Sequence, residues 1–275
     1  MLNVRETTCK TLLNKSNLAD FTLNCYVGCS HRCLYCYARY MTKFKARPED
    51  WGDFVDVKVN APEALAKQFK KIKTPGEVFM SSICDAWQPL EAKYKLSRAC
   101  LKLLLEADFE VSILTKSSLI QRDFDLLEAY KTPRLGMTLT TLDLALQKAL
   151  EPQASEPKDR LDTLRKAREK GIKTWVFLGP LIPEVTDSRT NLLGLLRALE
   201  GLDLDAIYVD RLNPRWGVLE ALKRGLSREG HPELRGMLYK ATNPTKYAEY
   251  TRQLRETATD LARQTGLSAN LKLCF

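Results

Sequence analysis

Short apolar runs alternate with helix-like segments along this chain, and that alternation limits the fold more than any other feature. The apolar runs are rich in β-branched and aromatic residues, which predicts strands over Phe21–Val27, Val78–Ser82, Phe109–Leu114, Arg134–Thr140, Lys173–Leu178 and Ala206–Asp210. Between them the sequence predicts helices over Pro62–Lys73, Lys95–Ala107, Asp123–Tyr130, Arg160–Lys170 and Ser188–Leu199. Strands separated by helices form parallel βα units. We therefore expect an α/β protein whose six units form a partial (βα)6 TIM-like barrel.

A further helix is predicted near the end of the chain, over Tyr247–Gly266. We expect residues 1–215 to form the barrel core and residues 216–275 to form a C-terminal helical extension packed on the barrel. In barrels of this kind the chemistry takes place at the carboxyl ends of the strands. The residues that follow each predicted strand are therefore the candidates for function.

The chain has more basic than acidic residues. It contains 43 Lys and Arg against 34 Asp and Glu, a formal net charge of +9. Such an excess favours anionic partners such as nucleic acid, nucleotides or phosphorylated metabolites. No run of 18 or more apolar residues occurs, so we expect no membrane partner. The first residues lack the apolar core of a signal peptide, which favours a cytoplasmic location.

Four of the eight cysteines fall between Cys25 and Cys36. Because the cytoplasm is reducing, cysteine spacing there points to metal binding or catalysis rather than to disulfides. Cys29, Cys33 and Cys36 form a C-x3-C-x2-C pattern directly after the first predicted strand. Three thiolates would leave one iron of a four-iron cluster without a protein ligand, and an open position is typical of catalytic metals. The alternative is a zinc site with His31 or Cys25 as fourth ligand, in a zinc-stabilised nucleic-acid-binding module that is not an enzyme.

This cysteine pattern, with an aromatic residue before its last cysteine, resembles the signature of the radical S-adenosylmethionine (SAM) superfamily. The resemblance implies an enzyme with two cofactors, a [4Fe-4S] cluster and SAM bound at its open iron. One electron, from a donor such as flavodoxin or ferredoxin, would cleave SAM to methionine and a 5′-deoxyadenosyl radical. That radical would abstract hydrogen from a substrate in a lyase or transferase type of reaction. The partial (βα)6 barrel is the superfamily's core.

Longer segments are similar to the spore photoproduct lyase-like branch, whose members are also described as DNA repair photolyase-like. The segments are Gly28–Arg39, Ser81–Glu91, Leu114–Asp123, Thr138–Asp143, Leu150–Leu161 and Pro180–Pro183. The similarity and the basic charge suggest a nucleotide or nucleic-acid base as substrate. The alternative keeps the radical chemistry and replaces the substrate by a small metabolite, sugar or peptide, as in natural-product biosynthesis.

The same resemblance assigns roles to side chains at the strand ends. It implies that Tyr35 contacts SAM near the adenine, and that Lys116 meets the SAM carboxylate in a charge-assisted pair. The remaining SAM contacts that it implies are Ser81, Ser82 and Asp85 for the amino group, Thr138 and Thr140 for the ribose or methionine, Arg160 for the carboxylate, and Asn213 for the adenine or substrate.

Two further residues are candidates for hydrogen-atom transfer. Cys84 directly precedes Asp85, and a thiol is a good donor because its S–H bond is weak. The lyase's donor cysteine would align with Ser82, two residues earlier, so Cys84 departs from the branch's pattern. Tyr37 matches a tyrosine in the lyase's relay and is the second candidate.

Overall fold

The computed structural model of the protein describes residues 2–44, 48–228 and 234–275. Its main sheet has the strand order β11-β10-β9-β8-β7-β6-β3-β2. The six central strands are parallel and follow one another in chain order: β3 (Phe21–Leu23), β6 (Glu77–Met80), β7 (Glu110–Thr115), β8 (Arg134–Leu139), β9 (Lys173–Leu181) and β10 (Ala206–Arg211). The predicted α/β fold and partial barrel are confirmed.

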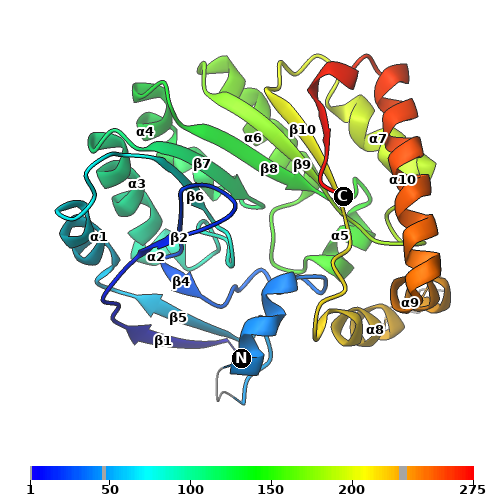
Figure 1. Cartoon of the computed structure of the whole chain (residues 1–275), viewed down its shortest axis with the longest axis horizontal. Helices are drawn as coiled ribbons and strands as arrows, with labels where there is room; N and C mark the ends of the chain where they lie inside the picture. Colours follow the sequence, from blue (N-terminus) through cyan, green and yellow to red (C-terminus); the bar gives the residue numbers. More distant parts are fainter. Residues whose placement is uncertain (1, 45–47, 229–233) are drawn as a thin grey trace.

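Helices cover the outer face of this curved sheet (Figure 1). Each predicted helix is present, as α1 (Ala61–Phe69), α3 (Leu96–Glu106), α4 (Phe124–Ala129), α6 (Pro157–Glu169) and α7 (Arg189–Ala198). Alternate strand residues are fully buried, among them Ile113, Met137 and Val176. Helix residues such as Leu104, Leu164 and Leu195 join them in one core. Burial of these apolar faces stabilises the barrel and fixes the register in which its strands end.

The segment predicted as one strand over Phe21–Val27 is two strands. β3 ends at Leu23, and β4 (Tyr26–Val27) pairs antiparallel with β5 (Phe54–Lys58) in a second sheet of order β1-β5-β4. The third strand of that sheet is β1 (Asn3–Thr7). The break follows from Asn24, whose side chain bonds to Ser82 (2.8 Å) and to the backbone N–H of Ile83 (3.1 Å) instead of continuing the strand. The chain is thereby redirected immediately before the cysteine pattern.

A three-residue strand lies at each edge of the main sheet. β2 (Leu13–Lys15) pairs antiparallel with β3, and β11 (Leu271–Leu273) pairs parallel with β10. Each contributes a lysine that lies over an aromatic ring of the neighbouring strand: Lys15 is 4.3 Å from the Phe21 ring centre and Lys272 is 5.3 Å from that of Tyr208. Short, charged edge strands discourage pairing with other chains.

Three helices follow β10, namely α8 (Val218–Arg228), α9 (Leu234–Thr242) and α10 (Pro244–Gln264). α10 confirms the predicted C-terminal helix and buries Tyr250, Leu254 and Ala258 along one face. α8 and α9 lie near the end of the barrel where the cysteine segment begins (Figure 1), together with α5 (Leu144–Leu150). In the described part of the chain, no helix is both long and apolar enough to span a bilayer.

Candidate active site

The cysteine segment starts at a glycine that the local geometry requires. Gly28 has a φ of +92°, and a Cβ built on it would lie only 2.3 Å from the carbonyl oxygen of Phe54 in β5. Glycine alone adopts this conformation without strain and permits such a close approach. The Gln88 side chain then holds the loop, because it accepts from the Ser30 backbone N–H (2.8 Å) and donates to the Gly28 carbonyl (3.3 Å).

All three predicted cluster ligands lie on this loop. Cys29 and Cys33 are buried and Cys36 is partly buried, and the Cys36 N–H donates to the Cys33 carbonyl at 3.3 Å. Burial raises the pKa of the Cys33 thiol to about 12, against the opposing charge of Lys116. Burial also raises the pKa values of Cys29 and Cys36. Such thiols become thiolates only beside strong positive charge, which the irons of a cluster supply.

Within residues 2–44, 48–228 and 234–275, no three His, Cys, Asp or Glu side chains converge closely enough to hold a single metal ion. A structural zinc ion needs four donors around one centre. A four-iron cluster makes a different demand, because each thiolate binds a separate iron. Three thiols on one loop, two of them buried and one partly buried, fit that second demand.

Two polar side chains at the carboxyl ends of neighbouring strands, Lys116 after β7 and Thr138 in β8, have no hydrogen-bond partner in the part of the chain that the structure describes. The Lys116 ammonium lies 5.8 Å from the centre of the Tyr35 ring. Burial lowers its pKa, but the negative charges of Cys33, Glu151 and Asp85 outweigh burial and raise the pKa overall, so the amine is protonated. The Thr138 hydroxyl oxygen is buried without a partner. An unpaired ammonium and an orphaned hydroxyl fit the carboxylate and hydroxyl groups of SAM.

Glu151 is a buried anion at the centre of this region that the sequence did not predict as a site residue. Its side chain is 1% exposed and forms an ion pair with Arg160. It also accepts hydrogen bonds from the hydroxyls of Tyr35 and Thr140. Burial alone would raise its pKa, but the charges of Arg160 and Lys116 and the hydrogen bonds from Arg160 and Tyr35 lower it to about 2. Glu151 therefore joins the cysteine loop to the end of β8 and to α6.

Arg160 is fully engaged by the protein. Besides Glu151, its guanidinium donates to the carbonyls of Thr138 (3.0 Å) and Ser155 (2.8 Å). Its predicted contact with the SAM carboxylate stays a prediction, whereas the Lys116 ammonium has no hydrogen-bond partner among the described residues. The signal for Glu151 lay in the Leu150–Leu161 segment, where this acid stands nine residues before Arg160.

The residues predicted to bind the SAM amino group lie together after β6, and their side chains contact the protein. Asp85 accepts from the Thr115 hydroxyl (2.7 Å) and from the Lys116 backbone N–H (2.8 Å), and lies 3.4 Å from the His31 ring. Burial opposes ionisation, but the charge and hydrogen bond of His31 outweigh it and hold the pKa of Asp85 well below its usual range.

The two serines stabilise the same turn. Ser81 has a φ of +81° and its hydroxyl accepts from the Ala86 N–H at 2.9 Å. The Ser82 hydroxyl accepts from Asn24 at 2.8 Å. These contacts show how the turn is held, and the SAM contacts predicted for Ser81, Ser82 and Asp85 remain untested.

The two candidates for hydrogen-atom transfer meet at this turn. The Tyr37 hydroxyl donates to the Ser82 carbonyl, and the Tyr37 ring is 37% exposed. Cys84 is buried in the main core, and its thiol lies 3.5 Å from both the Asn24 side-chain oxygen and the Tyr26 carbonyl. Burial raises the pKa of the Cys84 thiol, which favours the S–H form that a hydrogen-atom donor requires.

Asn213 is the predicted site residue that stands apart from these networks. It is exposed in the connection between β10 and α8, where its carbonyl accepts from the Arg215 N–H at 2.8 Å. Its position after the sixth parallel strand agrees with the general rule for strand ends, but it makes no contact with the cysteine loop among the interactions of the described residues.

Comparison with known proteins identifies the family. A sequence profile of the radical SAM superfamily matches residues 23–196, which run from the last residue of β3 through the cysteine loop and the strands β6 to β9. The chain belongs to the radical SAM superfamily. An uncharacterised protein of Methanocaldococcus jannaschii is 39% identical over 169 residues, which are 62% of this chain and 63% of that protein. An uncharacterised protein of Mycobacterium tuberculosis is 30% identical over 244 residues, covering 85% of this chain and 72% of the relative.

The fold of this radical SAM protein is similar to that of spore photoproduct lyase. The lyase in complex with dinucleoside spore photoproduct superposes with a TM-score of 0.71 at 16% identity, over 99% of this chain and 82% of the lyase. At that identity the likeness concerns the fold alone. The predicted membership of the superfamily is confirmed by the sequence profile, and the likeness to spore photoproduct lyase is a likeness in fold.

Proposed function

We propose that this radical SAM protein cleaves SAM reductively at a [4Fe-4S] cluster held by Cys29, Cys33 and Cys36, and modifies an organic substrate. The observation that carries the proposal is the position of three thiols, two buried and one partly buried, beside a protonated Lys116 that has no hydrogen-bond partner in the described part of the chain. When bound, the cluster and SAM together supply a 5′-deoxyadenosyl radical that takes a hydrogen atom from the substrate.

The chain's own residues bind and orient SAM. Lys116 pairs with its carboxylate, because the ammonium is charged and no described residue accepts a hydrogen bond from it. The buried Thr138 hydroxyl hydrogen-bonds the ribose or the methionine part, which satisfies an otherwise orphaned group. Glu151 fixes the position of Tyr35 by accepting a hydrogen bond from its hydroxyl. The burial of this region excludes water that would quench a radical.

The substrate class that we favour is a nucleotide or nucleic-acid base. The similar fold of a lyase solved in complex with dinucleoside spore photoproduct and the net charge of +9 support this choice. A small metabolite, sugar or peptide is the alternative. The chain spans 63% of the Methanocaldococcus jannaschii relative, and a substrate can depend on segments outside the shared region.

Anaerobic reconstitution of Cys33→Ala tests the chemistry. We expect the wild-type protein to bind about four irons and to release 5′-deoxyadenosine when dithionite is supplied. The variant should lose that release at least ~100-fold, because a cluster held by two thiolates is incomplete. Cys100→Ala, which removes a fully buried thiol away from the loop, is the matched control and should keep both iron and activity. Stoichiometric zinc in place of iron, or full activity of Cys33→Ala, would contradict the proposal.

A further inference from the structure

The inner face of the main sheet carries a row of side chains that the proposed function uses only at one end. This inner row consists of residues directly opposite one another on β8, β9, β10 and β11, namely Thr138, Phe177, Tyr208 and Lys272. Side chains alternate between the two faces of a strand, and neighbours of these residues such as Val176 pack in the core beneath the helices. The inner row therefore lies opposite the helices that cover the outer face (Figure 1).

Aromatic rings fill the middle of the inner face. Phe177 and Tyr208 are half-buried, and Trp175 lies two residues before Phe177, with its ring centre 5.2 Å from that of Tyr208. On its other side Trp175 lies 6.5 Å from the half-buried Phe79 of β6. Gly136 makes room for the indole, because a Cβ there would lie 2.3 Å from the Trp175 ring. The flat ring of a ligand can pack against such an aromatic surface.

Trp175 also has a buried donor without a partner. The residue is 7% exposed, and its indole N–H makes no hydrogen bond within the part of the chain that the structure describes. Buried donors in folded proteins are almost always paired. An acceptor that the chain itself does not supply is therefore expected beside Trp175. The carbonyl oxygen or the ring nitrogen of a nucleobase is such an acceptor, and the base also provides the flat ring.

A cation stands at the outer end of the inner row. Lys272 is exposed, its ammonium lies 5.3 Å from the centre of the Tyr208 ring, and it forms no ion pair among the described residues. Lys116, the cation assigned to the SAM carboxylate, follows β7 at the opposite end of the row. Four strand spacings separate β7 from β11, which is about 19 Å along the sheet. Lys272 is thus available to a second anion.

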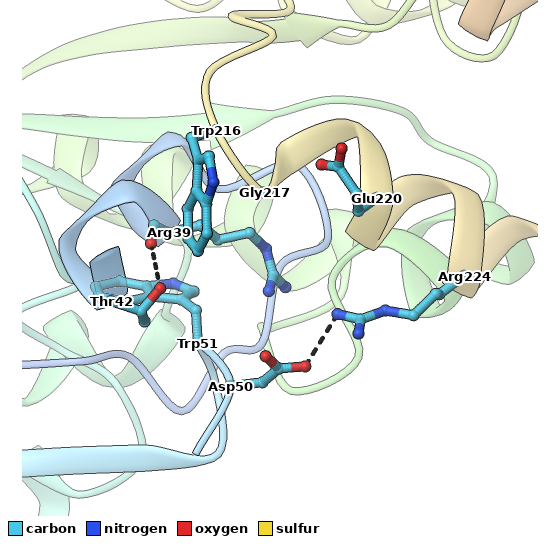
Figure 2. Close-up of a pocket in the computed structure, with 8 residues that line it drawn as sticks. All are labelled: Arg39, Thr42, Asp50, Trp51, Trp216, Gly217, Glu220 and Arg224. Carbon is cyan, nitrogen blue, oxygen red and sulfur yellow. Dashed lines mark hydrogen bonds and ion pairs between the residues drawn. The ribbon is translucent and has the colours of Figure 1, made fainter. Parts of the chain in front are cut away.

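The pocket beside the start of α8 selects no ligand in this way. It has a volume of about 280 Å³ and is drawn in Figure 2. Its Arg39 side chain donates to the carbonyls of Leu34 and Cys33, and its Arg224 forms an ion pair with Asp50. Because the protein already engages both arginines, the inner face of the sheet is the better place for an anionic ligand.

We propose that the inner face binds a nucleotide, with its base against Trp175 and Tyr208 and its phosphate at Lys272. The inference rests on the proposed function, because it names the substrate of the same radical chemistry. A nucleotide satisfies three features together, namely the aromatic surface, the unpaired indole N–H and the unpaired ammonium. A neutral sugar has neither a flat ring for Tyr208 nor an anion for Lys272. The C-terminal strand β11 would accordingly determine part of the specificity.

Isothermal titration calorimetry of the reconstituted protein with SAM present tests the phosphate contact. The probes are the 2′-deoxynucleoside 5′-monophosphates and the matching nucleosides. We expect Lys272→Gln to weaken binding of the monophosphates about tenfold and to leave nucleoside binding unchanged, because only the monophosphates carry the anion. Lys71→Gln removes a lysine that is also exposed, but after α1, and is the matched control.

Trp175→Phe tests the base contact, because it keeps an aromatic ring and removes the indole N–H. We expect this variant to weaken the binding of nucleosides and monophosphates by the same factor, about fivefold or more. Trp216→Phe is the matched control, since it makes the same exchange at a side chain that is 55% exposed. A Trp175→Phe variant with unchanged nucleoside affinity would overturn the assignment of the base.

The two proposals fail in different ways. Lys272→Gln overturns the nucleotide site if it weakens nucleosides and monophosphates equally or if it weakens SAM, and so does a wild-type protein that binds no monophosphate at millimolar concentration. A single-stranded trinucleotide distinguishes the sources of the nucleotide: tighter binding than the monophosphate indicates a strand, weaker binding indicates a free nucleotide, and either must depend on Lys272. A wild-type protein that binds monophosphates through Lys272 but releases no 5′-deoxyadenosine with dithionite keeps the site and overturns the proposed function.

Discussion

At the scale of single residues, the site depends on one buried ion pair that contacts the cysteine loop through the Tyr35 hydroxyl. Glu151 and Arg160 are each 1% exposed. Removing one partner from such a pair leaves the other as an uncompensated buried charge, which is far more costly than losing an exposed pair. Glu151 is therefore a positioning residue, since it acts on the cofactor site through Tyr35 and Thr140.

We expect Glu151→Gln to lower the free energy of unfolding by about 3–5 kcal/mol at pH 7. Urea unfolding followed by circular dichroism measures the change. Glu156→Gln is the control, because its partnership with Lys148 is half exposed and its loss should cost less than about 1 kcal/mol. Equal effects of the two substitutions would mean that the buried pair contributes nothing particular to stability.

The same ion pair determines how the stability of the fold changes with pH. The folded-state pKa of Glu151 is about 2, below the ordinary value of 4.5. Its stabilisation is therefore fully present above the ordinary pKa and is lost as pH falls through the folded-state value. The difference in the free energy of unfolding between the wild-type protein and Glu151→Gln should therefore become smaller as pH falls from 4.5 to 2.

At the scale of elements, α8 is the helix that closes over the cysteine loop. A Cβ on Gly225 would lie 2.1 Å from a methyl carbon of Leu34, so α8 approaches the loop as closely as its glycine allows. Cys33 and Tyr35 share a core cluster with Val218, Leu222 and other residues of the C-terminal helices. The position of α8 and the conformation of the loop are thus set together.

Two helix glycines make this contact measurable. Gly194 lies in α7, where an added Cβ would have no atom closer than 4.0 Å, so Gly194→Ala should raise stability by about 0.5–1 kcal/mol through helix propensity. Gly225→Ala gains the same propensity but overpacks Leu34, and should lower stability by about 1–2 kcal/mol. Thermal unfolding of both variants tests the difference. In a Leu34→Ala background the Gly225 substitution should become neutral or stabilising, and a persistent loss there would place the clash elsewhere.

At the scale of the whole molecule, the net charge of +9 bears on the substrate. If nucleic acid is bound, its phosphates release counterions, and affinity for a short oligonucleotide should fall at least tenfold between about 50 and 200 mM salt. Fluorescence anisotropy measures this dependence, with SAM binding as the control that changes little. Oligonucleotide affinity that is absent or insensitive to salt would instead favour a small metabolite, sugar or peptide.

The barrel could be predicted from the sequence because its βα units are local patterns. Each of the six strands and five helices was found near its predicted place, since apolar periodicity reports burial within one segment. The sheet of β1, β5 and β4 could not be predicted, because β1 is a largely exposed, polar strand without that periodicity. Among site residues, spacing predicted the three cysteines, whereas the contacts of Glu151 with Tyr35 and Arg160 exist only in the folded chain.

The edge strand β11 covers one side of β10 and thereby protects the main sheet from pairing with other molecules. A shortened version that stops before Leu271 would leave the outer backbone groups of β10 bare, along a stretch that contains Ile207 and Val209. Unpaired backbone N–H and C=O groups on an apolar edge strand can form hydrogen bonds with strands of other molecules. Removing these five residues would thus expose an unpaired edge strand and is expected to promote aggregation.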